Sequence, residues 1–178
     1  MIEVTIDSVR VSLTTQQRIV VLKDNTSDRY LAIFIGPFEA DAITYELQEI
    51  AQRRPLTHDL LKTVIEELGG TLAYVLISDI REDIYYARLV INIGDDRRVE
   101  IDSRSSDAIA LAVRVRVPIF VAESVLDRAG IRPENDIEVD VEAEDTETDT
   151  PAVDTRKLSA FADFLDTLDL DDLGDEDK

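Results

Sequence analysis

The twenty residues RRVEIDSRSSDAIALAVRVR, numbered 97–116, contain the change of pattern that decides the fold. Over the first six positions Val99 and Ile101 alternate with polar residues, and this alternation predicts a β-strand. We expect the side chains of Val99 and Ile101 to face inward. From Ser105 to Arg116 the chain is apolar nearly all round, which predicts a helix buried between layers. A strand that leads directly into a buried helix is typical of a domain whose helices pack on a sheet.

The N-terminal part of the chain has the same order of patterns, strands first and then a helix. Apolar residues alternate from Ile2 and change phase near Asp7, which predicts a β-bulge at Asp7-Ser8. Residues 18–23 and 30–35 predict two further strands, and we expect the second of them to be central because both of its faces are apolar. Residues 37–50 then show the apolar spacing of a helix.

A second helix and a second group of strands follow. Thr57 is a suitable N-cap for this helix, and Asp59 lies in its first turn. We expect its buried stripe to be formed by Leu60, Leu61, Val64, Ile65 and Leu68. Residues 72–80, 84–93, 97–102 and 119–121 predict strands, and 123–129 predicts a short helix that stops at Gly130.

The two halves of the domain resemble each other in order and in sequence. Asp41-Ala42-Ile43 corresponds to Asp107-Ala108-Ile109 at an offset of 66 residues. The turns between neighbouring strands are short, which favours antiparallel pairing. The sequence therefore predicts an α+β fold with a mostly antiparallel sheet or sheets, packed helices, and an internal duplication of a strands-then-helix unit.

Charge divides the chain into a domain and a tail. Residues 1–136 hold 23 acidic and 16 basic residues, whereas residues 137–178 hold 16 acidic and 3 basic ones. We expect one domain over 1–136, an acidic disordered linker over 137–155, a short amphipathic helix over 156–173 and an acidic terminus over 174–178. The apolar face of the tail helix needs a surface on its own domain, on a second copy or on a partner.

Composition excludes several classes of protein. The 178 residues include no Cys and one His, so neither a disulfide framework nor a multi-histidine metal site can form within one chain. No apolar run is long enough for a membrane span, and we expect a cytoplasmic protein without membrane association. The net charge of −20, with 4 Lys against 15 Arg, is typical of a protein from a salt-rich cytoplasm. The alternative is an ordinary acidic protein with a disordered tail.

Two polar segments could carry chemistry, and both precede or begin a predicted helix. They are 53–59, with Arg54 and His58, and 102–107, with Arg104. Helix N-termini favour anions such as phosphate, and arginine recognises the same group with two parallel hydrogen bonds. A purely structural interpretation accounts for many of the same residues, namely helix capping by Thr57, Asp59 and Asp107, an N-terminal acid at Glu39, and an ion pair between Asp102 and Arg104.

Three runs of sequence also resemble a known family. They are Ile35–Ile43, Arg54–Leu60 with its Arg-Pro-x-Thr-His-Asp motif, and Asp102–Leu111. In order and spacing they resemble the bifunctional nuclease domain family over residues 2–135. That resemblance implies an α+β fold, RNase and DNase activity on nucleic acid, and self-association into a homo-oligomer. The family usually has proline before its Ser-Asp pair, where this chain has Ser105.

From this resemblance and from side-chain chemistry we derive one hypothesis about a nuclease site. Arg54 and Arg104 would hold the phosphate, and His58 would act as general acid or base with Asp59 and Asp107. Asp102 and Asp107 would bind Mg²⁺ or Mn²⁺ if the reaction uses a divalent cation. The supporting residues would be Glu39, Thr57, Asp102 and Ser106.

The sequence leaves two other functions open. The chain could be a non-enzymatic binding or regulatory module that recognises an anionic ligand or a protein partner. Its acidity favours this alternative, because a nuclease surface usually carries a basic groove and no basic run is present. The tail helix could also give the protein a regulatory or assembly role.

Overall fold

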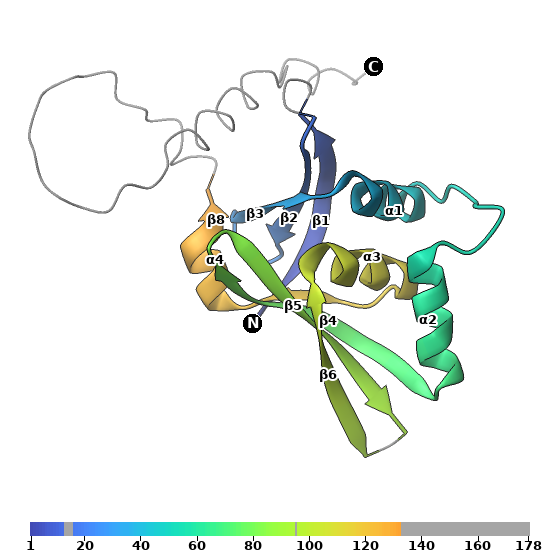
Figure 1. Cartoon of the computed structure of the whole chain (residues 1–178). Helices are drawn as coiled ribbons and strands as arrows, with labels where there is room; N and C mark the ends of the chain where they lie inside the picture. The colour runs from blue at the N-terminus through green and yellow to red at the C-terminus, as the bar shows by residue number, and fades with distance from the viewer. Residues whose placement is uncertain (13–15, 95, 133–178) are drawn as a thin grey trace, which may run out of the picture. The chain divides into compact units, whose positions relative to one another are not determined.

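The computed structural model describes residues 1–12, 16–94 and 96–132, and these ranges form an α+β domain. The sheet has eight strands in the order β6-β5-β4-β7-β1-β2-β3-β8 (Figure 1). All neighbouring strands are antiparallel except β4 and β7, which are parallel. The strands are β1 (Ile2–Val11), β2 (Arg18–Asp24), β3 (Tyr30–Ile35), β4 (Gly70–Arg81), β5 (Ile84–Ile93), β6 (Arg97–Arg104), β7 (Ile119–Val121) and β8 (Gly130–Ile131). The helices are α1 (Pro37–Leu47), α2 (Thr57–Glu67), α3 (Ser105–Val115) and α4 (Glu123–Ala129).

The predicted fold class is confirmed by this arrangement. The meander β1-β2-β3 precedes α1, and the meander β4-β5-β6 precedes α3. The duplication of a unit stays a prediction, because a common order of elements does not establish common descent. The predictions for residues 137–178 lie outside the described residues.

Helix α3 is the centre of the core, as its sequence predicts. Its residues Ala108 to Ala112 are all buried, and it packs against α1, α2 and the strands β4, β5 and β6. Figure 1 shows α3 between α1 and α2. The predicted bulge in β1 is also present, because the pairing of β1 with β2 shifts register between Ile6 and Ser8.

Two predictions about strands are wrong, and both errors arise from the position of the strand in the sheet. β3 is not central, because in the described part of the chain it lies next to the end of the sheet, between β2 and the two-residue strand β8, and its Phe34 is exposed. In β6 Ile101 is exposed rather than facing inward, because β6 is the edge strand of the described sheet and pairs there with β5 alone. Alternation of residue types indicates a strand but does not specify which strands flank it.

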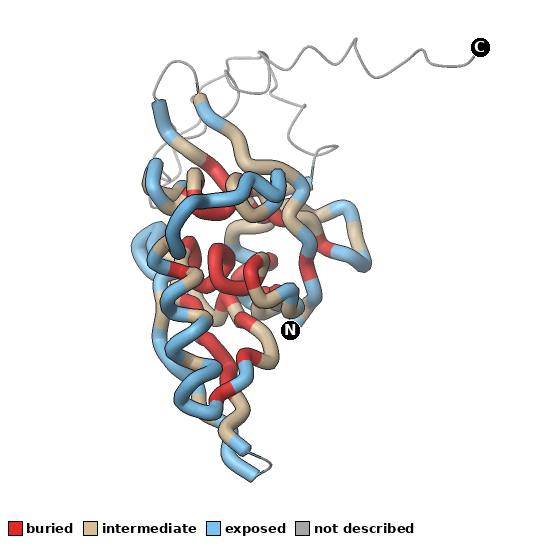
Figure 2. The backbone as a smooth tube through the Cα atoms, turned by 90° about the vertical axis from the view of Figure 1, so that its right-hand side faces the viewer, coloured by how far each residue is buried: buried red, intermediate tan, exposed pale blue. Residues whose placement is uncertain are grey.

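The predicted buried stripe of α2 is also wrong. Leu60, Leu61, Val64 and Leu68 are exposed, whereas Ile65 is partly buried and packs against the core. The only buried residue of this helix is His58. Figure 2, in which the side of the molecule that carries α2 faces the viewer, shows exposed positions along most of the helix. Helix α2 therefore contacts α3 and β4 along one narrow side and leaves most of its apolar residues outside.

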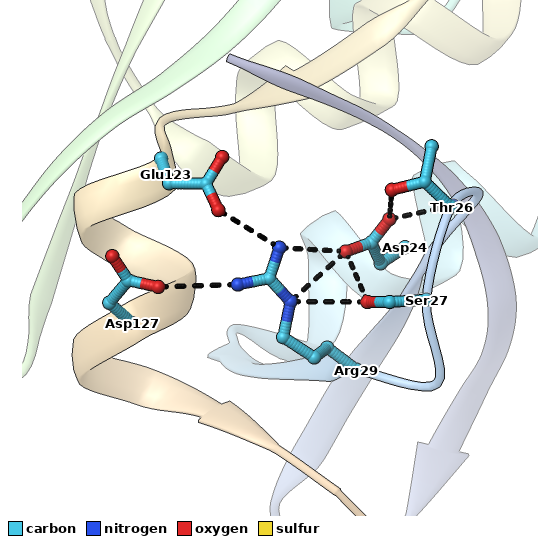
Figure 3. A network of polar contacts seen from close by, with 6 residues as sticks. All are labelled: Asp24, Thr26, Ser27, Arg29, Glu123 and Asp127. Carbon is cyan, nitrogen blue, oxygen red and sulfur yellow. Dashed lines mark hydrogen bonds and ion pairs between the residues drawn. The ribbon is translucent and has the colours of Figure 1, made fainter.

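A polar network ties α4 to the turn between β2 and β3 (Figure 3). The carboxylate of Asp24 is buried and accepts hydrogen bonds from Thr26, Ser27 and Arg29. Burial by itself raises the pKa of Asp24, but these hydrogen bonds outweigh it and hold the pKa well below its usual range. The guanidinium of Arg29 also reaches Glu123 and Asp127 of α4. The network is structural, because its members bond one another.

Candidate functional site

The first turns of three helices bring four polar side chains together. Glu39 belongs to α1, His58 to α2 and Asp107 to α3, and Arg104 immediately precedes α3. The residue before each helix, Gly36, Leu56 or Arg104, has an extended backbone conformation, so each helix begins directly after an extended segment. The two polar segments singled out in the sequence therefore meet in the structure, although 49 residues separate His58 from Asp107.

Arg104 links the two carboxylates of this cluster. Its Nε donates to Oδ2 of Asp107 over 2.7 Å, and its Nη2 donates to Oδ1 of Asp107 over 3.0 Å. The same Nη2 donates to Oε1 of Glu39 over 2.8 Å. A Cβ at Gly36, which precedes α1, would clash with the Glu39 carboxylate, so the missing side chain there allows Glu39 to fold back toward the cluster. Arg104 itself is 67% exposed, so solvent and ligands can reach its guanidinium.

His58 is joined to this cluster through Asp107. Its Nε2 lies 3.1 Å from Oδ1 of Asp107. Burial raises the pKa of the Asp107 carboxyl, but the hydrogen bonds and charges of Arg104 and His58 outweigh it and lower the pKa below its usual value. Asp107 is therefore ionised near neutral pH and can only accept a hydrogen bond, which assigns the donated proton to Nε2 of His58.

The other ring nitrogen of His58 is available for chemistry. Nδ1 forms no hydrogen bond with any residue in the described ranges. No side-chain nitrogen or oxygen of the described residues is both buried and unpaired, so Nδ1 keeps contact with solvent although His58 is only 8% exposed. A neutral imidazole with a proton on Nε2 and a free lone pair on Nδ1 can accept a proton at Nδ1.

Asp59 forms no hydrogen bond with the described residues of the His58 cluster and has two structural contacts. Its Oδ2 accepts a hydrogen bond from the backbone N–H of Leu56, and its Oδ1 lies 2.7 Å from Nε of Arg114. Burial raises the pKa of Asp59, but these bonds outweigh it and lower the pKa. Helix α2 thus begins at Thr57 with Leu56 as its N-cap, and the predicted capping by Thr57 is wrong because Asp59 caps the helix instead.

Arg114 is the residue of this region that the sequence analysis missed. Its side chain is 3% exposed and donates to Asp59 of α2, to the carbonyl of Ala42 in α1 and to the carbonyl of Ala110 in its own helix. One buried guanidinium therefore bonds to all three helices that carry the cluster. The signal in the sequence is a single charge inside an otherwise apolar stretch, because a buried arginine requires partners.

The remaining predicted site residues do not join the cluster. Arg54 lines a pocket between α1 and α2, and no hydrogen bond connects it to Arg104 or His58. Asp102 lies exposed on β6, and its side chain forms no hydrogen bond or ion pair with a described residue. Thr57 is exposed, whereas Ser106 is buried in the first turn of α3.

A divalent cation would have limited room at the cluster as it stands. Both carboxylate oxygens of Asp107 already accept hydrogen bonds, from Arg104 and from His58. In the described part of the chain no three His, Cys, Asp or Glu side chains are grouped as ligands for a metal ion. A site at Asp102 and Asp107 would need water and phosphate oxygens for most of its coordination shell.

None of the helices in the described ranges has the length and apolar character needed to cross a membrane.

Comparison with known proteins gives both full-length and partial matches. Residues 20–134 match the family described as the bifunctional nuclease domain. An uncharacterized protein of Mycobacterium tuberculosis is 39% identical over 170 residues, which are 96% of this chain and 96% of that protein. Bifunctional nuclease 1 of Oryza sativa subsp. japonica is 29% identical over 116 residues, which are 64% of this chain and 35% of the rice protein. Bifunctional nuclease 2 of Arabidopsis thaliana is 26% identical over 116 residues, with the same shares of the two chains.

Proposed function

Because this chain belongs to the bifunctional nuclease domain family, we propose that it cleaves phosphodiester bonds of RNA or DNA at the cluster around His58. The observation that carries the proposal is the bond between His58 and Asp107, which leaves Nδ1 in contact with solvent and without a hydrogen bond to any described residue. A proton acceptor held by a carboxylate and placed beside an exposed arginine suits attack on a phosphate.

In the proposed reaction, Nδ1 of His58 accepts a proton from a water molecule as the water oxygen attacks the phosphorus. The new P–O bond forms, the bond from phosphorus to the leaving sugar oxygen breaks, and the imidazolium returns the proton to that oxygen. Asp107 keeps Nε2 protonated and stabilises the imidazolium between the two proton transfers. Atoms and charge balance without a further reactant.

Arg104 would stabilise the negative charge that accumulates on the phosphate oxygens. Its guanidinium is 67% exposed, and its remaining N–H groups can donate to a phosphate while Nε stays on Asp107. Glu39 would keep this guanidinium in place. If the reaction uses Mg²⁺ or Mn²⁺, Asp102 and Asp107 are the residues that would hold the cation, which would help to neutralise the phosphate.

The test compares cleavage of single-stranded RNA and DNA oligonucleotides by wild type, His58→Gln and Arg104→Lys. Loss of proton transfer in His58→Gln should lower the rate by about 10²-fold or more. Arg104→Lys should also weaken cleavage, because a point charge replaces a planar fork. The assay is run with and without Mg²⁺ or Mn²⁺, at equal folded fractions measured by circular dichroism.

Arg128→Lys is the matched control for the arginine variant. Arg128 is also exposed and ion-paired, with Asp79, and it belongs to α4, which carries no residue of the cluster. Its replacement should leave cleavage unchanged. Equal loss of cleavage in Arg128→Lys and Arg104→Lys would contradict the proposed role of Arg104, and full activity in His58→Gln would contradict the proposed role of His58.

We also propose that the protein self-associates, as the family resemblance implies. The exposed side chains Leu60 and Val64 of α2 and Leu68 at its C-cap have helical spacing and form an apolar surface, and such surfaces commonly mark sites of association. Light scattering after size exclusion should show a mass above that of one chain in wild type and a lower mass in Val64→Lys. Ile84→Lys, at an exposed apolar residue of β5, should not change the mass.

A binding module without catalysis is the second candidate function. The observation that favours it is that Arg104 is already shared between two carboxylates, which weakens its attraction for a phosphate. In this alternative the cluster only holds the three helix N-termini together. Purified wild type that cleaves neither RNA nor DNA under any of the assay conditions would favour it.

A further inference from the structure

A pocket of about 510 Å³ lies between the C-terminal end of α1 and the first turn of α2. Arginine side chains and apolar residues share its lining, which also includes Glu46, Glu49 and Gln52. The pocket is separate from the bonds that join His58, Asp107 and Arg104, although Asp59 lines it from the same turn of α2 that carries His58. Its lining arginines are Arg53, Arg54, Arg114 and Arg116.

Three of these arginines have no partner among the residues that the structure describes. Arg114 is paired with Asp59, but the side chains of Arg53, Arg54 and Arg116 form no hydrogen bond or ion pair with any residue in the described ranges. This is unusual in a chain with 39 acidic residues against 19 basic ones, where most other described arginines are ion-paired. The pocket is also lined by Glu46, Glu49 and Asp59, but these carboxylates form no ion pair with the three arginines, whose N–H groups are therefore available to a bound anion.

The backbone at Arg116 gives a second, independent indication. Arg116 ends α3 with φ 60° and ψ 46°, which is the left-handed conformation that normally favours glycine at this position. A side chain here costs conformational energy, and the exposed guanidinium of Arg116 forms no hydrogen bond or ion pair with a described residue that would compensate. Uncompensated strain of this kind is concentrated at binding sites.

We infer that this pocket binds the phosphate group of a nucleotide through Arg53, Arg54 and Arg116. The phosphate follows from the arginines, because guanidinium groups match its oxygens with paired hydrogen bonds. The pocket is much larger than a phosphate ion and has the size of a small-molecule site. Its apolar lining, with Tyr45, Ile50 and Leu56, suits a base or a sugar next to the phosphate. That the ligand is a nucleotide rests on the proposed function, whereas binding of phosphate does not.

Isothermal titration of the full chain with AMP, adenosine and inorganic phosphate tests the inference. AMP should bind, and adenosine, which lacks the phosphate, should bind at least tenfold more weakly. Arg53→Gln/Arg54→Gln and, separately, Arg116→Gln should each weaken AMP binding by about tenfold or more, the scale of losing a charge-assisted hydrogen bond. Equal affinities for AMP and adenosine, no AMP binding at millimolar concentration, or AMP binding that both variants leave unchanged would each overturn it.

Arg97→Gln is the matched control, because Arg97 also has no partner among the described residues but lies on β6 and does not line the pocket. The AMP affinity of this variant should equal that of wild type, and weaker AMP binding would mean that overall charge, rather than the pocket, determines binding.

His58→Gln separates this inference from the proposed reaction, because it should keep AMP binding while losing cleavage. If wild type cleaves nothing but binds AMP through Arg54, the pocket stands and the nuclease proposal fails. The dinucleoside phosphate ApA then distinguishes the two sources of phosphate, since tighter binding of AMP indicates a terminal phosphate and tighter binding of ApA an internal one.

Discussion

The ion pair between Arg114 and Asp59 should be a main support of the site, and its strength can be measured. Arg114 has a 3% exposed side chain, and the Asp59 side chain is 35% exposed. We expect Arg114→Met to lower the free energy of unfolding substantially, because it removes a buried partner and three hydrogen bonds at once. Removing one partner of a buried pair costs about 3–5 kcal/mol.

The partial exposure of Asp59 moves this expectation to the lower end of the range. Once Arg114 is gone, water can reach the Asp59 carboxylate, and the Leu56 N–H still donates to it. We therefore expect about 3 kcal/mol for Arg114→Met. Asp59→Asn should cost about 1–2 kcal/mol, because a neutral hydrogen bond replaces a charge-assisted one.

A double-mutant cycle measured by urea unfolding isolates the interaction between the two side chains. The control cycle uses Arg88 and Glu100, which lie 2.6 Å apart with exposures of 53% and 49%. The Arg114–Asp59 bond is nearly the same length at 2.7 Å, so burial is the main difference between the two pairs. We expect a coupling energy of about 2 kcal/mol for the buried pair and about 0–1 kcal/mol for the exposed one. Equal coupling energies would refute the argument that burial gives Arg114 its importance.

Three further predictions concern stability. The pKa of Asp24 is lowered in the folded state, so the ionised carboxylate stabilises the folded protein above its unfolded pKa of about 4, and this stabilisation is lost as pH falls through the folded pKa. Asp24→Asn should therefore lower the free energy of unfolding at pH 7 and make that free energy depend less on pH in acid. Arg116→Gly should raise the thermal midpoint by roughly 2–4 °C, because glycine adopts the left-handed conformation without strain, and an unchanged or lower midpoint would contradict the strain argument. The midpoint of wild type should rise between about 0.1 M and 3 M KCl as salt screens the net charge of −20, whereas a flat profile would contradict the interpretation as a salt-adapted protein.

The sequence predicts local features of this fold well. The bulge near Asp7 follows from a change in the alternation of apolar residues along β1, and the burial of Ala108 to Ala112 follows from the unbroken apolar run in α3. Both patterns lie within a short stretch of sequence. Gly69 likewise ends α2 with a positive φ, as a glycine after a helix predicts. Properties that depend on a residue and its near neighbours are therefore the ones that can be predicted.

Placement between distant segments is what the sequence does not specify. The apolar residues of α2 have the spacing of a buried stripe, but nothing in residues 57–68 indicates that one narrow side alone meets the core. The site shows the same division. Both polar segments can be recognised in the sequence. Which aspartate meets which partner depends on how α2 packs against α3, and in the structure Asp107 bonds to His58 whereas Asp59 bonds to Arg114.

The three-residue strand β7 has a consequence for the order in which the chain folds. It lies between the two meanders, pairing with β1 on one side and with β4 on the other. Val4 of β1 meets Ile119 of β7, so the two partners are 115 residues apart in the chain. Each meander can form from neighbouring residues as it leaves the ribosome, but closing this long loop is entropically slow, and the two halves cannot join in one sheet until β7 has been synthesised. We expect the amides of β7 to be the last to gain protection in pulsed hydrogen exchange during refolding. Pairing of this short strand near the end of the domain would then be the step that completes the sheet.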